Sequence, residues 1–481
     1  MDVVEQLGEL LREAGFAGER SSVLAGMPGG VPPPEVLEAV DRPEDARLAT
    51  LLKLFHHDET VARAAAEQAL RPLKIEDILE AGLVETDGAD ARSPMKLSTF
   101  DGLIVAGDPI RGDNRGVSSV VNLSDVSIAV SGLTVRREGE TALDLGTGSG
   151  VQALLAARHA DRVVGLDVNP HALSFARLGQ RLNGVENVRW LEGDWLEPVR
   201  GQRFDLVVAT PPVAISPDNV LLYRDSPIGG EALSRQLVRE CAEHLADGGF
   251  ATVFCNWTHA EGAWEESPRE WVADLGCDAL ILNLGSHEAM VYAMNHVNDR
   301  PGLDPETVTP TVNRWVEHFG REGVGQIATG VIVLRRRPSG PNWTRAFKTD
   351  RLPRGAAGTQ LERMFAGADF LSSNSGLEQL RELMMSPWQL VEGHRLDQGL
   401  VYENGAYKGQ AVLAQGWMNL YARVDPRVVS VVAGCDGQRP LAAVLREAPT
   451  PDGLERGQFQ ELCLSTIRDL IARGFLVKDG A

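Results

Sequence analysis

Seven β-rich runs alternate with helical patterns in the middle of the chain, between about residues 123 and 337. The runs are TALDL, RVVGLDV, VRWLEGD, FDLVVAT, GFATVFCNW, ALILNLG and ATGVIVLRR. Strands that alternate with helices along a sequence are typical of a parallel sheet with helices on both of its faces. We therefore expect a complete α/β domain here, and we place its limits at residues 108–337.

The regions on either side of this domain share a different pattern. Residues 1–107 are mostly helical and close with a helix that stops at Gly82, a strand, a turn and returning strands. Residues 338–481 close with FQELCLSTIRDLIARGFLVKDG, in which a helix stops at Gly474 and a strand follows. Glycine often ends helices because it adopts the left-handed conformation without strain. This order is that of a winged helix, so we predict two flanking winged-helix-like domains.

Two further segments stand out near the end of the central pattern. Residues 286–323 form an insertion between the last two β-rich runs, with two helical patterns joined by a Pro-Gly turn. Both a substrate cover and a packing element are compatible with this position. Residues 335–354, RRRPSGPNWTRAFKTDRLPR, combine basic residues with Pro and Gly. We interpret them as a solvated interdomain linker, with a local basic surface as the alternative.

Charge and cysteine usage limit the possible partners. The 481 residues include 47 Lys and Arg against 67 Asp and Glu, which gives a net charge of −20. Such a field repels a phosphate backbone, so nucleic acid is less expected as a substrate. The five cysteines are far apart and the ten histidines are scattered. We therefore expect buried thiols, and no metal site is implied.

The sequence also bears on localisation. Its first residues, MDVVEQLGELLREAG, form an acidic amphipathic pattern and lack the basic and apolar parts of a signal peptide. No later window holds the uninterrupted apolar run that a membrane-spanning helix requires. We therefore expect a cytoplasmic protein with no membrane partner.

The stretch ALDLGTGSGVQALLAA indicates a ligand site. A strand that ends at Leu145 runs into Gly146, Gly148 and Gly150, and a helix follows. Glycines let a ligand approach the turn closely, and the start of the helix offers unpaired backbone N–H groups. The spacing is D-x-G-x-G-x-G, with Asp144 first, and it differs from the G-x-G-x-x-G of dinucleotide dehydrogenases.

Four motifs together resemble those of one enzyme family. LDLGTGSG, GLDVNPHAL, LEGDW and ATPPV occur in the order and spacing of class I S-adenosylmethionine-dependent methyltransferases. The chain is most similar to the group with an Asn/Asp-Pro-Pro-Tyr motif, such as release-factor glutamine, ribosomal RNA guanine and adenine-N6 methyltransferases. The resemblance covers only the middle domain. It implies a Rossmann-like domain at residues 108–337 that binds S-adenosyl-L-methionine and transfers its methyl group.

The resemblance also implies roles for the residues at the strand ends. Asp144 and the glycine backbone would face the amino-acid tail and sulfonium of the cofactor, and Asp167 would accept both ribose hydroxyls. Asp194 would accept from the adenine amino group, with Trp195 either covering the ring or packing in the core. In isolation, Asp167 and Asp194 are equally compatible with simple turn residues. The predicted cofactor-binding residues are Asp144, Gly146, Thr147, Gly148, Gly150, Asp167, Val168, Asp194 and Trp195.

The stretch ATPPV supplies the predicted catalytic turn, whose residues are Thr210, Pro211, Pro212 and Val213. In the similar families this turn offers an Asn or Asp side chain and a proline carbonyl to a substrate NH2, and an aromatic residue stacks on the substrate. Here Thr210 replaces the Asn or Asp and Val213 replaces the aromatic residue, so only the Pro211 carbonyl is retained. The alternative is that the prolines merely end a strand.

Downstream, Tyr223 and Arg224 are predicted to bind the substrate, with a plain surface loop as the alternative. The acceptor is expected to be a nitrogen or oxygen of a peptide, a protein or a small metabolite. Two alternatives remain: a ribosomal RNA or tRNA base methyltransferase, and a regulator that binds S-adenosylmethionine without catalysis. Winged-helix domains in methyltransferases pair subunits or close over small substrates, so a homodimer through a terminal domain is a further expectation.

Overall fold

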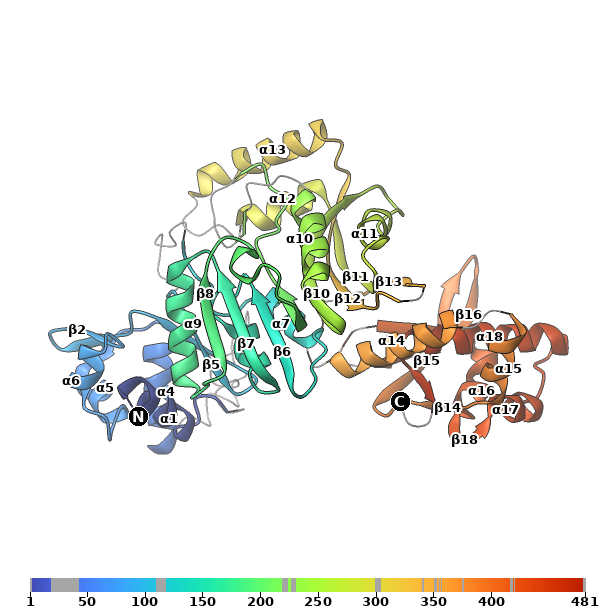
Figure 1. The fold of residues 1–481 in the computed structure, drawn as a ribbon, viewed down its shortest axis with the longest axis horizontal. Coiled ribbons are helices and arrows are strands. Elements are labelled where there is room, and N and C mark those ends of the chain that lie inside the picture. Colours follow the sequence, from blue (N-terminus) through green and yellow to red (C-terminus); the bar gives the residue numbers. More distant parts are fainter. Residues whose placement is uncertain are drawn as a thin grey trace.

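The computed structural model describes residues 2–18, 43–109, 118–218, 224–225, 231–298, 304–339, 341–349, 353, 355, 357–373, 376–415, 418 and 420–478. A central sheet stands in the middle of the molecule, and the N-terminal and C-terminal regions lie on opposite sides of it (Figure 1). Among the described residues, no helix combines the length and the apolar character that crossing a membrane requires.

The central sheet has eight strands in the order β13-β11-β12-β10-β9-β6-β7-β8. Strand β12 is antiparallel to β10 and β11, and the other neighbouring pairs are parallel. All seven predicted runs form strands of this sheet, which confirms the mixed α/β architecture. The strands are β6 (Glu140–Leu145), β7 (Ala160–Asp167), β8 (Val188–Glu192), β9 (Phe204–Ala209), β10 (Leu245–His259), β11 (Cys277–Glu288), β12 (Gln326–Arg336) and β13 (Thr344–Lys348).

Strand β13 corrects two predictions. It adds an eighth strand to the expected seven, and it lies within the segment interpreted as a solvated linker. The linker interpretation was wrong because Trp343 and Phe347 are buried and β13 pairs with β11. The guanidinium of Arg335 contacts the buried carboxylate of Asp278 and that of Asp369, each at 2.6 Å. The sheet thus continues beyond residue 337, where we expected the central domain to end.

Helices cover the sheet, as the alternating pattern predicts. The helices of this region are α7 (Asp125–Gly132), α8 (Val151–Ala156), α9 (Pro170–Leu182), α10 (Ala232–Glu243), α11 (Glu266–Val272), α12 (Ala289–Asn298) and α13 (Pro305–Arg321). Helices α7, α8, α10 and α11 contribute apolar side chains to the same large core as the strands. Helix α9 packs into the core of the N-terminal region, and α12 and α13 form a separate apolar cluster. Helices α12 and α13 are the two helices predicted for the insertion, and they pack against each other above the sheet (Figure 1).

The N-terminal region combines helices with short strands. Its elements are α1 (Val3–Glu13), α4 (Pro43–Phe55), β1 (Val61–Ala62), α5 (Arg63–Ala69), α6 (Ile75–Glu80), β2 (Glu85–Asp87), β3 (Asp90–Arg92) and the hairpin of β4 (Lys96–Phe100) and β5 (Leu103–Gly107). Gly82, at φ +69°, follows α6 as expected. Helix α1 packs closely on α9, because Gly8 lacks a side chain where a Cβ would lie 2.0 Å from the Leu182 carbonyl oxygen.

The C-terminal region has its own core and two three-stranded sheets. Its elements are α14 (Gly358–Ser373), α15 (Leu377–Met385), β14 (Pro387–Leu390), β15 (His394–Glu403), β16 (Ala406–Gln415), β17 (Leu420–Val424), α16 (Val429–Ala433), β18 (Asp436–Pro440), α17 (Leu441–Glu447), α18 (Arg456–Ala472) and β19 (Leu476–Lys478). Gly474, at φ +71°, ends α18 before β19, as predicted. All five cysteines are buried and unpaired, which confirms the expectation of buried thiols.

Candidate functional site

The candidate site lies where the order of the strands reverses. From β6 the chain moves through β7 to β8 on one side, and it then returns to β9 on the other side of β6. In open α/β sheets, ligands bind beyond the carboxyl ends of the strands at such a reversal. The glycine turn that follows β6 and the Pro-Pro turn that follows β9 both lie at this point.

The glycine turn has the conformation that its sequence requires. Gly146, Gly148 and Gly150 have φ values of +70°, +54° and +85°, a region that other residues enter only with strain. A Cβ on Gly148 would meet no atom within 4 Å, so the space beside this residue is open. A Cβ on Gly150 would lie 2.9 Å from the ring of Trp190. Gly150 therefore serves packing, while Gly148 leaves room for a ligand.

Asp144 is the buried carboxylate of the site, with only 1% of its surface exposed. Its Oδ2 accepts hydrogen bonds from the Thr147 hydroxyl and from the backbone N–H of Ala153. Among the described residues, no donor reaches its buried Oδ1. Burial, together with the nearby charge of Asp167, raises the pKa of Asp144 to about 7. A buried acceptor without a donor is costly, so this oxygen favours a ligand that brings a donor or a positive charge.

Asp167 ends β7 and lies next to the glycine turn. Its Oδ2 accepts the N–H of Gly148 at 2.8 Å, and its Oδ1 accepts the N–H of Asn169 at 2.9 Å. Burial raises the pKa of this carboxyl group. Each carboxylate oxygen can accept a second hydrogen bond, so both remain available to ligand hydroxyls. The neighbouring Val168 is 51% exposed at the rim of the site.

The loop after β8 brings Asp194 close to the end of β7. The N–H of Gly193 donates to the Asp167 carbonyl at 3.2 Å, and the Asp194 side chain is exposed. Trp195 has a φ of +55°, and its indole N–H donates to the carboxylate of Glu240 in α10. The Trp195 ring is partly buried against the central core. Of the two roles considered for Trp195, this contact favours packing.

The Pro-Pro turn lies directly against the glycine turn. The N–H of Thr210 donates to the Leu145 carbonyl at 3.2 Å, and a Cβ on Gly146 would lie 3.3 Å from the Cα of Pro211. Thr210 and Pro212 are partly exposed, whereas Pro211 is buried. Val213 is 5% exposed and belongs to the central core. The partly exposed residues of the turn are therefore Thr210 and Pro212, while the side chain at the usual aromatic position is buried.

The segment that follows is held by the helical insertion. Tyr223 lies outside the described residues. The guanidinium of Arg224 donates to the buried carboxylate of Asp225 and to the His296 carbonyl, each at 2.7 Å. The Arg224 side chain is only 11% exposed. These contacts favour a structural role for Arg224 over the predicted contact with substrate.

Two residues near the turn were not singled out from the sequence. The hydroxyl of Tyr292 in α12 accepts from the N–H of Ile215 at 3.0 Å and from the side-chain amide of Asn256 at 3.2 Å. Asn256 is an amide residue in the mostly apolar run GFATVFCNW, and that pattern could have identified it. Tyr292 gave no such signal, because an aromatic residue in a helical pattern most often packs in a core.

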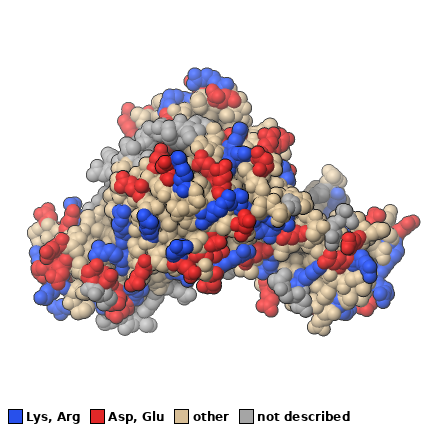
Figure 2. Space-filling model, in the orientation of Figure 1, with Lys and Arg blue, Asp and Glu red and all other residues tan. Residues whose placement is uncertain are grey.

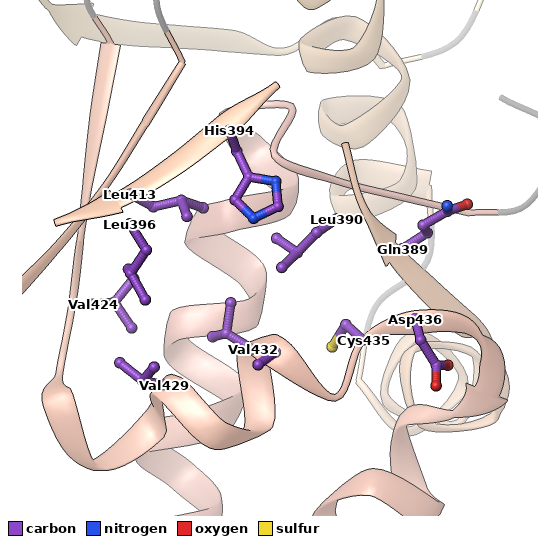
Figure 3. Close-up of a pocket in the computed structure, with 11 residues that line it drawn as sticks. Gln389, Leu390, His394, Leu396, Leu413, Val424, Val429, Val432, Cys435 and Asp436 are labelled. Atoms are coloured by element: carbon purple, nitrogen blue, oxygen red, sulfur yellow. The ribbon is translucent and has the colours of Figure 1, made fainter. Parts of the chain in front are cut away.

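A cavity of about 330 Å³ lies elsewhere, in the C-terminal region (Figure 3). Its wall is mostly apolar and is formed by residues such as Leu396, Leu413 and Val432, with His394 and Asp436 among its polar members. It contains none of the residues predicted for cofactor or substrate. We therefore assign the functional site to the edge of the central sheet, where the sequence motifs meet.

The same part of the chain matches a known family. Residues 136–283 match a family model described as a methyltransferase domain. Residues 136–283 therefore form a methyltransferase domain. Residues 2–94 match a second model, described as a domain of unknown function (DUF7059).

Curated relatives of the methyltransferase domain include two protein-modifying enzymes. Release factor glutamine methyltransferase from Xylella fastidiosa is 34% identical over 126 residues, which cover 24% of this chain and 46% of that protein. Ribosomal protein L11 methyltransferase from Thermus thermophilus is 34% identical over 133 residues, which cover 27% of this chain and 51% of that protein. The chain thus spans about half the length of these relatives.

Solved structures that resemble this chain include methyltransferases, with low TM-scores. A methyltransferase from Pyrococcus furiosus is 18% identical and has a TM-score of 0.30, with 50% of this chain and 91% of that chain covered.

Proposed function

We propose that this protein is an S-adenosylmethionine-dependent methyltransferase that modifies a nitrogen of a protein acceptor. The supporting observation is the meeting of three features at one point: the unsatisfied buried Oδ1 of Asp144, the open space at Gly148 and the backbone of Pro211. The first two fit a cationic ligand that carries donors, and the third lies where an acceptor would approach. The names of the two curated relatives, which specify protein substrates, support a protein acceptor.

The residues present fit the cofactor. Asp144 would accept from its charged tail, Asp167 would accept its ribose hydroxyls, and the exposed Asp194 would accept its adenine amino group. When bound, S-adenosylmethionine supplies an electrophilic methyl group on a sulfonium. The cofactor-binding set remains Asp144, Gly146, Thr147, Gly148, Gly150, Asp167, Val168 and Asp194, with Trp195 packed behind it.

On the acceptor side, the chain contributes position and hydrogen-bond acceptors. The Thr210 hydroxyl and the Pro211 carbonyl would accept N–H groups of the substrate nitrogen. A planar nitrogen is a poor nucleophile because its lone pair is delocalised, and acceptors that favour a more pyramidal nitrogen stabilise the transition state. The rigid prolines keep these acceptors in place before substrate binds.

We propose also that the terminal regions are winged-helix-like and that one of them pairs two copies of the chain. The support is the order of elements, with α6 and α18 each ending at a left-handed glycine before a short strand. Sedimentation velocity of the full chain tests the homodimer directly. A monomer across the concentrations used for activity would contradict it.

Surface charge also favours a protein acceptor over RNA. On the face shown in Figure 2, acidic and basic side chains are interspersed over the central and terminal regions. The net charge of −20 adds a general repulsion of phosphate. RNA methyltransferases need clustered positive charge to hold their substrate. Because the charges on this face are mixed, RNA is the second candidate acceptor after protein.

Incubation with methyl-labelled S-adenosylmethionine and fractionated cell extract tests the proposal. We expect label in the protein fraction, and excess S-adenosylhomocysteine should suppress it. Label confined to RNA would establish the second candidate instead. Binding of S-adenosylhomocysteine with no transfer to any fraction would favour a regulator without catalysis.

A further inference from the structure

The Pro-Pro turn is anchored at both of its ends. At its start, the N–H of Thr210 donates to the Leu145 carbonyl of β6. At its end, the N–H of Ile215 donates to the Tyr292 hydroxyl. The two prolines between these anchors have no N–H, and the N–H of Ala214 donates to the Arg224 carbonyl at 3.2 Å. The direction of the Pro211 carbonyl therefore depends on how firmly the residues on either side of the prolines are held.

Tyr292 connects the far end of the turn to the sheet. Its hydroxyl oxygen also accepts from the side-chain amide of Asn256, which lies in β10 next to β9. A hydroxyl has two lone pairs, and these two donors occupy both of them. Through one oxygen atom, the turn after β9 is thus fixed to the neighbouring strand.

The helical insertion fixes the Tyr292 hydroxyl by packing around the tyrosine ring. Tyr292 is 1% exposed, its ring stacks on His296 at 3.9 Å, and it packs edge-on against Phe319 at 6.2 Å. Ile215 belongs to the same apolar cluster. The aromatic ring therefore fills the cluster, and the hydroxyl makes the hydrogen bond to the turn. These two roles can be separated by experiment.

A second contact holds the chain just beyond the turn. The guanidinium of Arg314 in α13 contacts Asp218, with Nη1 2.6 Å from Oδ1, and the indole N–H of Trp315 donates to the same carboxylate at 2.8 Å. The side chain of Asp218 is only 10% exposed. The insertion thus grips the chain both at Ile215 and three residues later, so it fixes the path of the chain that leaves the turn.

We propose that Tyr292 is a positioning residue for methyl transfer: its hydroxyl holds the Ile215 amide and thereby the direction of the Pro211 carbonyl. This role rests on the proposed function and assigns a purpose to the insertion between β11 and β12. Small displacements of a positioned group reduce rates strongly, because the acceptor atom no longer aligns with the group that it attacks. The proposed cofactor contacts lie at the ends of β6, β7 and β8 and do not involve the insertion.

The variant Tyr292→Phe tests the proposal, because it keeps the ring and removes only the hydroxyl. We expect exchange of the Ile215 amide hydrogen to accelerate roughly tenfold, as a hydrogen bond to a buried partner is lost. The turnover number should fall roughly tenfold or more. The calorimetric affinity for S-adenosylhomocysteine should stay within about twofold of wild type, because the turn lies outside the predicted cofactor contacts.

Phe319→Leu is the matched control, since it loosens the same apolar cluster and keeps the Tyr292 hydroxyl. If Tyr292 is a positioning residue, Tyr292→Phe should lose more turnover than Phe319→Leu when the two variants lose equal thermal stability. Equal turnover losses that track the folded fraction in both variants would contradict it, and so would unchanged exchange at Ile215. Absence of methyl transfer by the wild-type protein would instead contradict the proposed function, and the exchange measurement would still decide whether Tyr292 holds the turn.

Discussion

The two halves of the candidate site are built in different ways. The proposed cofactor half consists of the ends of β6, β7 and β8, and its buried carboxylates bond to residues close in sequence or on the adjacent strand, as Asp144 does to Thr147. The acceptor half is the turn after β9, and its far end is held by Tyr292, 77 residues further along the chain. The cofactor half contains a buried hydrogen-bond acceptor without a donor, the Oδ1 of Asp144. The acceptor half is held by a side chain of the helical insertion, that of Tyr292. We therefore expect cofactor binding and acceptor alignment to be separable by mutation at this edge of the sheet.

The largest expected effect concerns the cofactor half. Asp167→Ala removes the carboxylate that we assign to the ribose, and it should weaken S-adenosylhomocysteine binding by roughly 1.5 to 3 kcal/mol, or about ten- to hundredfold. Isothermal titration calorimetry measures this directly. The control is Asp161→Ala, which removes an exposed carboxylate from the same strand. Unchanged affinity in Asp167→Ala would remove this residue from the site.

The variant Gly148→Ala distinguishes the loss of space for a ligand from the strain of placing a side chain at a positive φ. Its Cβ would occupy the open space beside the glycine turn at a φ of +54°. Gly184→Ala is matched, because Gly184 also has a positive φ, +64°, and no atom within 4 Å of its Cβ. Both variants should lose about 1 kcal/mol of stability, but only Gly148→Ala should bind S-adenosylhomocysteine roughly tenfold more weakly. Equal affinities would show that the space at Gly148 is not used by the ligand.

This contrast explains what could be predicted from the sequence. The glycine turn, Asp144 and Asp167 were identified because their conformation and contacts follow from a short stretch or from adjacent parallel strands. The strand order placed the Thr210 turn beside them. The brace by Tyr292 and the β13 strand could not be predicted, because both depend on partners distant in sequence. The sequence left two roles open for Trp195 for the same reason, since its hydrogen-bond partner Glu240 is 45 residues away.

The two halves should also differ in their dependence on pH. Because the pKa of Asp144 is about 7, its charged form disappears as the pH falls below 7, and S-adenosylhomocysteine should bind about tenfold more weakly at pH 6 than at pH 8. The stability of the ligand-free protein should change with pH in the opposite direction. A raised pKa adds stability that is full below the unfolded value near 3.8 and is lost as the pH rises through about 7. Calorimetry and thermal unfolding at matched pH values test both trends, and flat profiles would contradict them.

The smallest expected effect concerns the acceptor half. Pro211→Ala should loosen the turn and lower turnover by roughly two- to fivefold, because a flexible residue replaces one whose φ is fixed. The affinity for S-adenosylhomocysteine should not change, and the ratio of mutant to wild-type turnover should be constant between pH 6 and 8, since no group in this turn titrates there. Pro426→Ala is the control, because it replaces an exposed proline of the C-terminal region. If the prolines only end a strand, both variants should lose stability without a selective loss of turnover. Single-turnover rates compared with cofactor affinity distinguish these outcomes, because a turn that aligns the acceptor must affect the rate of transfer and leave binding intact.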